Sequence, residues 1–200
     1  MSALLVLVGV GASSAQRHAV PGHYNVPQPW LWKPAAGTST NAIANPSFES
    51  GGVNNGWFQC GDVGAYVTKE HPYRGSYDAY AGTATGAGEP RGNSGICQRV
   101  TIPPAAMLSA RLYQLSNEGN AVLAYQEADL LDDRGEVVLN LYRSVNNKAA
   151  WILSQWNLSP YAGRSFWLYF GVHGDGYPKL STQQFVDDVF LASVAPHGPK

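Results

Sequence analysis

Short runs of β-favouring residues recur from residue 41 almost to the end of the chain. Clusters of Gly, Pro, Asn and Asp, the residues that form tight turns, separate these runs. No stretch repeats with the longer period of an amphipathic helix. Strands are expected at residues 66–69, 76–81, 96–102, 109–116, 122–131, 136–144, 166–172 and 184–193. Strands at this spacing predict an all-β fold, a two-sheet antiparallel β-sandwich (jelly roll) of about eight strands.

The composition agrees with a chain that turns often. The 200 residues include 22 Gly and 13 Pro, and only 14% of them are charged, which is typical of many short strands. The formal net charge is −1, and no polybasic stretch occurs. Binding to nucleic acid or to an anionic membrane surface relies on clustered cations. We therefore expect neither as a partner.

Residues 1–15 combine an apolar run with small residues that end in Ser13, Ser14 and Ala15. This order is typical of a secretory signal peptide and its cleavage site, although no Lys or Arg precedes the run. The run is too short to span a bilayer, so no membrane insertion is expected after signal cleavage. The alternative is a buried first strand. A cleaved signal peptide predicts a protein that is secreted or held at the cell surface.

Three segments follow the signal peptide. Residues 16–40 contain four prolines and no regular period, so we expect a Pro-rich extended arm or linker. Residues 41–194 carry the predicted strands and form the β-sandwich. Residues 195–200 form a tail.

The chain contains two cysteines, Cys60 and Cys97. An even number of cysteines in an exported protein favours disulfide formation. We therefore predict a disulfide between them. The alternative is a pair of buried free thiols.

Alternation along residues 165–171 places Trp167 and Tyr169 on the face that points away from the core. The same alternation turns Tyr113 outward on its own strand. Flat aromatic rings bind the C–H faces of sugars, so these three residues are a candidate ligand-binding surface for a glycan or for a neighbouring extracellular protein. The alternative is that the arm of residues 16–40 covers them and forms a second, smaller core.

Two consecutive acids, Asp187 and Asp188, lie in the middle of the last β-favouring run. An ionised carboxylate is costly to bury unless a cation, hydrogen-bond donors or solvent surrounds it. The pair therefore predicts a feature that compensates negative charge at this strand.

Five groups of residues occur in a characteristic order: 45–51 (NPSFESG) with 56–57 (GW), 73–77 (YRGSY), 97–103 (CQRVTIP), 157–163 (NLSPYAG) after Trp151, and 186–189 (VDDV). In order and spacing they resemble the galactose-binding-like jelly roll. That domain type is common among carbohydrate-binding modules and accessory domains of secreted bacterial enzymes. The likeness covers residues 43–193. It also implies that Trp57 and Trp151 are interior.

The resemblance implies one structural calcium ion where the first strand meets the last. Carried over to this sequence, its carboxylate ligands are Glu49 and Asp187. Main-chain carbonyls of the 73–77 loop, including those of Arg74 and Ser76, would add to the six to eight oxygens that calcium favours. Asp188 points to the opposite face of its strand, and we expect it to accept hydrogen bonds from backbone, Arg or Tyr. The alternative is that these acids lie in water at a strand end.

The resemblance favours a non-catalytic, secreted domain that binds carbohydrate. A structural or adhesive protein of extracellular assemblies, with possible self-association, is the alternative, and a hydrolase ranks last. Neither a Gly-x-Ser-x-Gly elbow nor a His-Glu-x-x-His zinc motif occurs. Residues 173–176 are interpreted as a turn. Hydrolysis of a glycosidic bond needs two carboxylates across a cleft, and the spacing of Glu70, Glu89, Glu118 and Glu127 singles out no pair.

Overall fold

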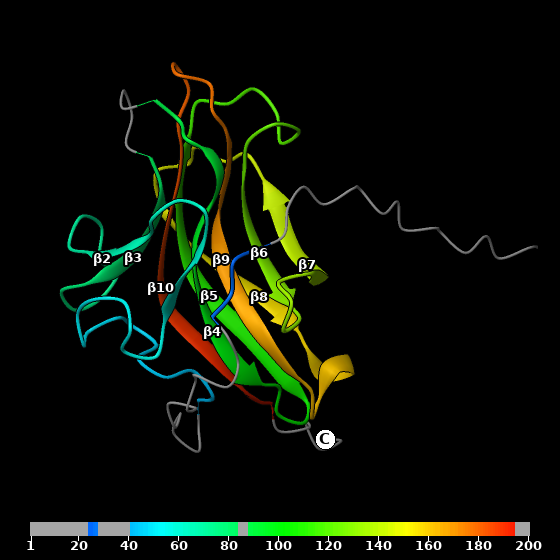
Figure 1. Ribbon diagram of the computed structural model, residues 1–200. Coiled ribbons are helices and arrows are strands. Elements are labelled where there is room, and N and C mark those ends of the chain that lie inside the picture. The colour runs from blue at the N-terminus through cyan, green and yellow to red at the C-terminus, as the bar shows by residue number, and fades with distance from the viewer. Residues whose placement is uncertain (1–23, 28–40, 84–87, 195–200) are drawn as a thin grey trace, which may run out of the picture.

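The computed structural model describes residues 24–27, 41–83 and 88–194. The predicted signal peptide, the predicted tail and most of the predicted arm lie outside the described residues. Ten strands form two antiparallel five-stranded sheets that pack face to face (Figure 1). The predicted fold class is therefore confirmed. The described part of the chain contains no helix with the length and apolar character that crossing a bilayer requires.

The first sheet, called sheet I, has the strand order β1-β4-β9-β6-β7. The second, called sheet II, has the order β2-β3-β10-β5-β8. The strands of sheet I are β1 (Phe58–Gly61), β4 (Arg91–Thr101), β9 (Ser165–Asp175), β6 (Tyr125–Leu131) and β7 (Val137–Ser144). Those of sheet II are β2 (Tyr66–Thr68), β3 (Asp78–Gly82), β10 (Thr182–Ser193), β5 (Ala106–Ser116) and β8 (Trp151–Asn157), and a short 3₁₀ helix, η2 (Ser159–Tyr161), precedes β9.

Two strands, β1 and β8, were not predicted from the sequence. Strand β1 has only four residues, and the glycine at its end resembles a turn signal. Strand β8 alternates as a strand should, but its first tryptophan matched a position that is interior in the resembling domains. Residues 173–175, interpreted as a turn, are the end of β9. Gly174 lies within β9 and does not end the strand. Glycine is required at this position because a Cβ would collide with the Pro90 carbonyl and the Glu89 side chain.

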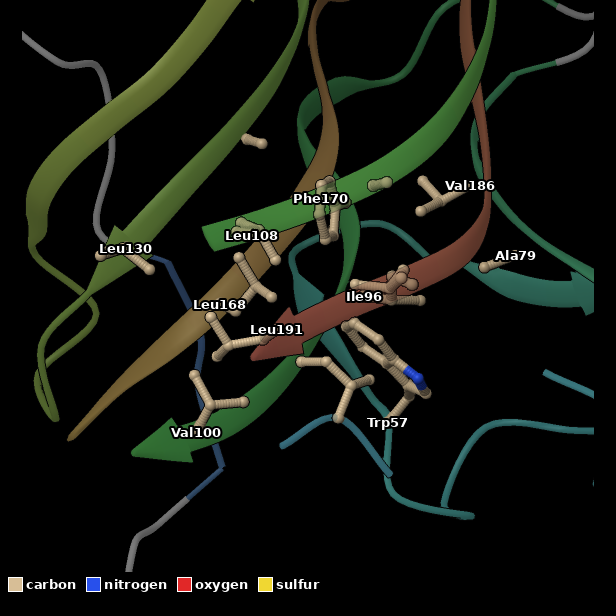
Figure 2. Packing of buried hydrophobic residues seen from close by; sticks show 14 of the residues in the cluster. Trp57, Ala79, Ile96, Val100, Leu108, Leu130, Leu168, Phe170, Val186 and Leu191 are labelled. Atoms are coloured by element: carbon tan, nitrogen blue, oxygen red, sulfur yellow. The ribbon is translucent and has the colours of Figure 1, made fainter. Parts of the chain in front are cut away.

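The core lies between the sheets because alternate residues of each strand face the opposite sheet. Strand β5 shows this directly, with strictly alternating buried and half-buried side chains. Trp57, Phe170, Leu168 and Leu108 meet in this layer, and each is completely or almost completely buried (Figure 2). A fully buried side chain of this size contributes about 1.5–3 kcal/mol to folding. The predicted burial of Trp57 is confirmed.

The predicted disulfide joins Cys60 of β1 to Cys97 of β4, with their Cα atoms 5.8 Å apart. Cys97 pairs across the strands with Phe58, and Cys60 with Gly95, so the bond runs diagonally over the outer face of sheet I. The cross-link holds the short edge strand β1 on the sheet.

A β-bulge interrupts β10 between Asp187 and Phe190, where the register against β5 shifts. Asp188 takes a positive φ of 46° at this point, and the N–H of Val189 turns away to the carbonyl of Pro46. The bulge bends the strand and re-aims its side chains. Asp188 forms an ion pair with Arg74 at 3.7 Å, which is too long for the hydrogen bond that the sequence analysis expected from an arginine.

Candidate functional site

The outer face of sheet I carries Trp167 and Tyr169, and both side chains are completely buried. The described segment 24–27 runs across this face (Figure 1). The Tyr24 ring packs edge-on against Tyr169, with ring centroids 4.8 Å apart. An exposed surface at Trp167 and Tyr169 was therefore the wrong expectation. The alternative prediction, a second small core under the arm, is confirmed for residues 24–27.

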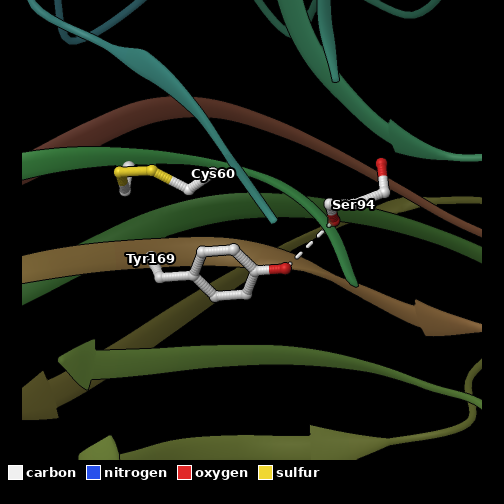
Figure 3. Close-up of a disulfide and its surroundings, with 4 residues drawn as sticks. Cys60, Ser94 and Tyr169 are labelled. Carbon is white, nitrogen blue, oxygen red and sulfur yellow. Dashed lines mark hydrogen bonds between the residues drawn. A yellow bond between two sulfur atoms is a disulfide. The ribbon is translucent and has the colours of Figure 1, made fainter. Parts of the chain in front are cut away.

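The Tyr169 ring lies next to the disulfide, and its hydroxyl donates to the carbonyl of Ser94 at 3.1 Å (Figure 3). A Cβ at Gly95 would lie 2.4 Å from the Tyr169 ring. Glycine is therefore required at this position of β4 for the ring to lie flat across the strand.

Backbone and side-chain hydrogen bonds hold segment 24–27 in place. The Tyr24 N–H donates to the carbonyl of Gly135 at 3.2 Å, and the Asn25 carbonyl accepts from the N–H of Gly61 at 3.3 Å. The Asn25 side chain donates to Asp62 at 3.0 Å. These contacts fix Tyr24 between the β6–β7 hairpin and the edge strand β1.

Beneath Tyr24 lies a group of polar side chains, here called the acidic centre: Tyr24, Glu127, Asp129, Asn140 and Arg143. The Tyr24 hydroxyl donates to Glu127 Oε1 at 2.6 Å and lies 3.4 Å from Asp129 Oδ2. Arg143 Nη2 donates to Glu127 Oε2 at 3.1 Å, and Asn140 Nδ2 donates to Asp129 Oδ1 at 2.6 Å. Both carboxyl groups are completely buried.

Burial raises the pKa of Glu127, and the hydrogen bond from Tyr24 and the charge of Arg143 oppose that shift. The pKa of Asp129 is raised well above its usual range by burial first and by the charge of Glu127 second. Two carboxyl groups share one arginine, and like charges this close disfavour double ionisation. The pair therefore titrates as a coupled unit.

Arg143 also lies over the ring of Tyr125, 4.0 Å from its centroid, and that ring stacks on His173 at 5.1 Å. Burial and then the positive charge of Arg143 lower the pKa of His173. The polar groups on this face form one connected layer. Because segment 24–27 closes that layer, the carboxyl groups contact protein atoms and not solvent. Glu127 and Asp129 also lie two residues apart on one strand, which is not the arrangement of two acids facing each other across a cleft.

Tyr113 lies on the outer face of sheet II and is thus separated by the whole sandwich from Trp167 and Tyr169. The prediction that the three rings share one surface is wrong, because strand alternation tells which side of its own sheet a residue faces but not which sheet it belongs to. Tyr113 is half-buried.

Around Tyr113 lies a set of half-buried side chains that we call the aromatic face: His71, Tyr73, Arg111, Tyr113 and Trp151. His71 stacks on Tyr113 at 4.5 Å, and Tyr113 meets Trp151 at 5.7 Å. Tyr73 contacts Trp151 at 5.9 Å. The guanidinium group of Arg111 lies 4.4 Å from the centroid of the Tyr73 ring.

Sheet pairing and one loop build the aromatic face. Strand pairing places Tyr113 of β5 opposite Trp151 of β8 and also opposite Phe185 of β10. Phe185 is completely buried and contacts both Tyr113 and His71. It lies beside Tyr113 on the same face of sheet II and helps to fix the positions of the two rings. Trp151 was predicted to be interior because of the resemblance, but it is half-buried on the outer face of sheet II.

A cavity of about 320 Å³ adjoins the aromatic face, and Arg111 belongs to both. Its other lining residues are Asn41, Pro46, Ser109, Leu153, Asp188, Val189 and Phe190. Leu153 and Phe190 are 46% and 44% exposed. The cavity thus combines exposed apolar surface with a guanidinium, a carboxylate and a hydroxyl group. This combination suits a ligand that has both C–H faces and hydroxyl groups.

The structure brings Glu49 and Asp187 to the same loop, residues 73–77. Asp187 Oδ2 accepts from the N–H groups of Tyr73 at 2.9 Å and Arg74 at 3.1 Å. Glu49 accepts from the N–H groups of Ser76 and Tyr77, each at 3.0 Å. A calcium site needs oxygen atoms where these N–H donors lie. In this structure backbone N–H groups of the 73–77 loop, and not the carbonyls that the calcium prediction invoked, face the carboxylates of Glu49 and Asp187.

Burial raises the pKa of Asp187 to about 6, against hydrogen bonds from the N–H groups of Arg74, Asp188 and Tyr73. The sequence predicted that a cation, hydrogen-bond donors or solvent would compensate the charge of this acid, and the structure shows hydrogen-bond donors around it.

No known protein-family profile matches the sequence, and no curated protein matches it. Solved structures do match. The chain is similar to TmCBM61, solved in complex with β-1,4-galactotriose, at 17% identity and a TM-score of 0.54, over 78% of this chain and 100% of that one. A structure of carbohydrate-binding modules of the β-sandwich superfamily matches at 16% identity and a TM-score of 0.51, over 78% of this chain and 64% of that one.

The K1 cleaved adhesin domain of Lys-gingipain from Porphyromonas gingivalis W83 matches at 14% identity and a TM-score of 0.51, over 74% of this chain and 96% of that domain. At such identities the matches show a shared fold. The resemblance to the jelly roll of carbohydrate-binding modules is therefore confirmed at the level of fold.

Proposed function

We propose that this domain binds carbohydrate without catalysing a reaction, and that the aromatic face of sheet II with its adjoining cavity is the binding surface. The observation that carries the proposal is the position of Arg111. Its guanidinium packs on Tyr73 and also lines the cavity beside Asp188. Aromatic rings for the sugar faces and charged groups for the hydroxyls therefore occur side by side.

The fold similarity to modules named as carbohydrate-binding supports this ligand class. Of the three residues that the sequence indicated for ligand binding, Tyr113 remains in the proposal. Trp167 and Tyr169 leave it, because Tyr24 and its neighbours bury them.

Binding can be measured by calorimetry and tryptophan fluorescence against a panel of neutral oligosaccharides that includes β-1,4-galactotriose. Trp151→Ala removes the largest ring of the aromatic face. Burial of such a side chain is worth about 1.5–3 kcal/mol, and losing about half of the upper value corresponds to about tenfold weaker binding. The matched control is Tyr177→Ala, which removes a 50% exposed aromatic ring outside the aromatic face.

The proposal predicts that Trp151→Ala weakens binding while Tyr177→Ala leaves it unchanged, with both variants folded by circular dichroism. Absence of binding across the panel, or equal affinity of the two variants, would refute the aromatic face as the site.

A second function, assembly with another copy or another extracellular protein, has one observation in its favour. Leu153 and Phe190 expose apolar surface beside the cavity, and the chain shares its fold with an adhesin domain. Sedimentation at micromolar concentration tests it. Self-association that Phe190→Ser abolishes, together with no oligosaccharide binding, would favour assembly over carbohydrate binding.

The proposal includes export to the cell surface or the medium, and the disulfide supports it because such bonds persist in oxidising compartments. It keeps residues 1–15 as a signal peptide, 16–40 as an arm and 41–194 as the domain. It includes no enzymatic activity, since Tyr24 closes the acidic centre. It does not place calcium at Glu49 and Asp187, whose carboxylates accept backbone N–H groups.

A further inference from the structure

Three acids from distant parts of the chain meet at one end of the sandwich. Glu89 lies in the connection from β3 to β4, Glu118 follows β5, and Asp175 ends β9. The connections after β5 and β9 reach the top of the molecule in Figure 1. One carboxylate oxygen from each residue lies within 4.8 Å of the others. We call these three residues the acidic cluster.

Two oxygens of the acidic cluster are buried and lack a hydrogen-bond partner among the described residues. They are Oε1 of Glu89 and Oε1 of Glu118. The Glu89 side chain is only 6% exposed, and its other oxygen accepts the N–H of Asp175 at a long 3.4 Å. Buried polar atoms without partners are rare and costly in folded proteins. An oxygen in this state, on a side chain that is grouped with two other carboxylates, indicates that a compensating partner is missing.

No ion pair between described residues supplies that charge. The described ion pairs involve Asp188, Asp133 and Glu127 and none of the cluster acids. Arg91, the neighbouring cation on β4, directs its Nε to the Asp175 carbonyl at 3.2 Å. Three carboxylates this close to one another cannot all stay ionised unless a cation lies between them; without a cation they must take up protons.

The backbone is shaped to admit the Glu89 side chain. A Cβ at Gly174 would lie 2.7 Å from Glu89 Cγ and 2.3 Å from the carbonyl of Pro90. Any larger residue at this position of β9 would push Glu89 away from Asp175. The hydroxyl of Ser116 accepts the N–H of Glu118 at 3.1 Å, which fixes the start of the loop that carries the second acid.

We propose that the acidic cluster of Glu89, Glu118 and Asp175 binds a divalent cation, calcium, and thereby ties three connections of the sandwich together. The donor set consists of oxygens alone, which favours a hard cation over zinc or copper. Calcium–oxygen distances of about 2.3–2.6 Å separate opposite ligands by about 4.6–5.2 Å, whereas the shorter magnesium bonds allow only about 4.2 Å. The three oxygens all lie within 4.8 Å of one another, close enough for one calcium ion to contact all of them, and the titration against magnesium tests the choice of metal.

The test uses the full chain after removal of cations with a chelator. Calcium chloride and magnesium chloride are titrated separately by calorimetry, and melting temperature is followed in parallel. One calcium ion per chain and a calcium-dependent rise in melting temperature are expected. Glu118→Gln, which keeps the size of the side chain, should weaken calcium binding by about tenfold or more and abolish the rise. Asp175→Asn provides a second variant with the same expectation.

The control is Glu49→Gln, which changes the other acid predicted from the sequence and should keep the full calcium response. In chelator, Glu118→Gln should melt at or above the temperature of the unchanged protein, because it removes one of three repelling charges. A structural role without a metal would instead lower that temperature. Absence of calcium binding overturns the proposal, and so does a preference for magnesium. Loss of the response in Glu49→Gln with retention in Glu118→Gln would place the ion elsewhere and also overturn it. None of these outcomes depends on oligosaccharide binding.

Discussion

Replacing Tyr24 by Phe tests how segment 24–27 is held on sheet I. The substitution removes one hydroxyl group and keeps the ring that packs on Tyr169. The lost hydrogen bond is short, 2.6 Å to Glu127 Oε1, and its acceptor belongs to a buried acid. A hydrogen bond to a charged group is worth about 1.5–3 kcal/mol, while the 3.4 Å contact to Asp129 adds little. We expect Tyr24→Phe to lower the free energy of unfolding by about 2 kcal/mol at neutral pH.

The loss should depend on pH. The Tyr24 hydrogen bond lowers the pKa of Glu127 against the effect of burial, so removing it raises that pKa further in the folded state. A folded state that holds its proton more tightly than the unfolded chain loses stability as pH rises above the ordinary carboxyl pKa. The difference between the two proteins should therefore grow from about pH 4 upward and be smaller at pH 5 than at pH 7.5.

Urea denaturation followed by far-ultraviolet circular dichroism at both pH values measures this difference. A loss of 2 kcal/mol corresponds to a fall in melting temperature of about 4–8 °C for a domain of this size. Tyr66→Phe, at a tyrosine that is 55% exposed, is the control and should stay within about 0.5 kcal/mol of the unchanged protein. A Tyr24→Phe variant as stable as that control at pH 7.5, or a loss that is equal at both pH values, would refute the reasoning.

Three further changes have defined outcomes. Gly135→Ala should destabilise the protein by more than about 1 kcal/mol and shift tryptophan fluorescence to the red. The reason is that Gly135 has φ of 80° and that a Cβ there would lie 2.0 Å from the Tyr24 carbonyl oxygen. The control Gly119→Ala, whose Cβ would have no atom within 4 Å, should show neither effect in the same urea experiment. Reducing the disulfide, which spans 37 residues, should cost about 4 kcal/mol on the chain-entropy argument, and unchanged melting in reductant would contradict this. Stability should fall as pH rises from about 4 to about 6, since burial raises the pKa of Asp187 to about 6, and Asp187→Asn should flatten part of that fall in denaturation measured across this range.

Most of the sandwich was predictable because two signals in the sequence are local. Alternating residues indicate a strand, and turn residues mark its ends. Eight of the strands and the buried rows of β5 and β9 follow from them. The disulfide followed from a cysteine count and an inferred compartment. Strand β1 was missed because four residues are too few to show a period.

The candidate site was harder to predict because it depends on which strands share a sheet. Tyr113 and Trp167 both face away from the core, and nothing local to either strand shows that β5 and β9 belong to different sheets. Tyr24 lies in a Pro-rich segment without periodicity, so no local signal connects it with Glu127, a contact across 103 residues. The acidic cluster has the same origin, since two loops, which carry Glu89 and Glu118, and the end of β9, which carries Asp175, meet only after folding.

A face that is closed by the chain's own residue responds to ligands differently from an empty one. Tyr24 is covalently tethered beside sheet I, so its local concentration there is on the order of millimolar or higher. A molecule that needs the same space can bind only to the fraction of chains in which Tyr24 has lifted away, and its apparent Kd is its intrinsic Kd divided by that fraction. An opening cost of about 2.7 kcal/mol leaves roughly one chain in a hundred open. At that opening cost the apparent Kd of any ligand for the outer face of sheet I would be about a hundredfold weaker than its intrinsic Kd. A ligand with a millimolar intrinsic Kd would escape detection, while one with a micromolar intrinsic Kd would still bind measurably.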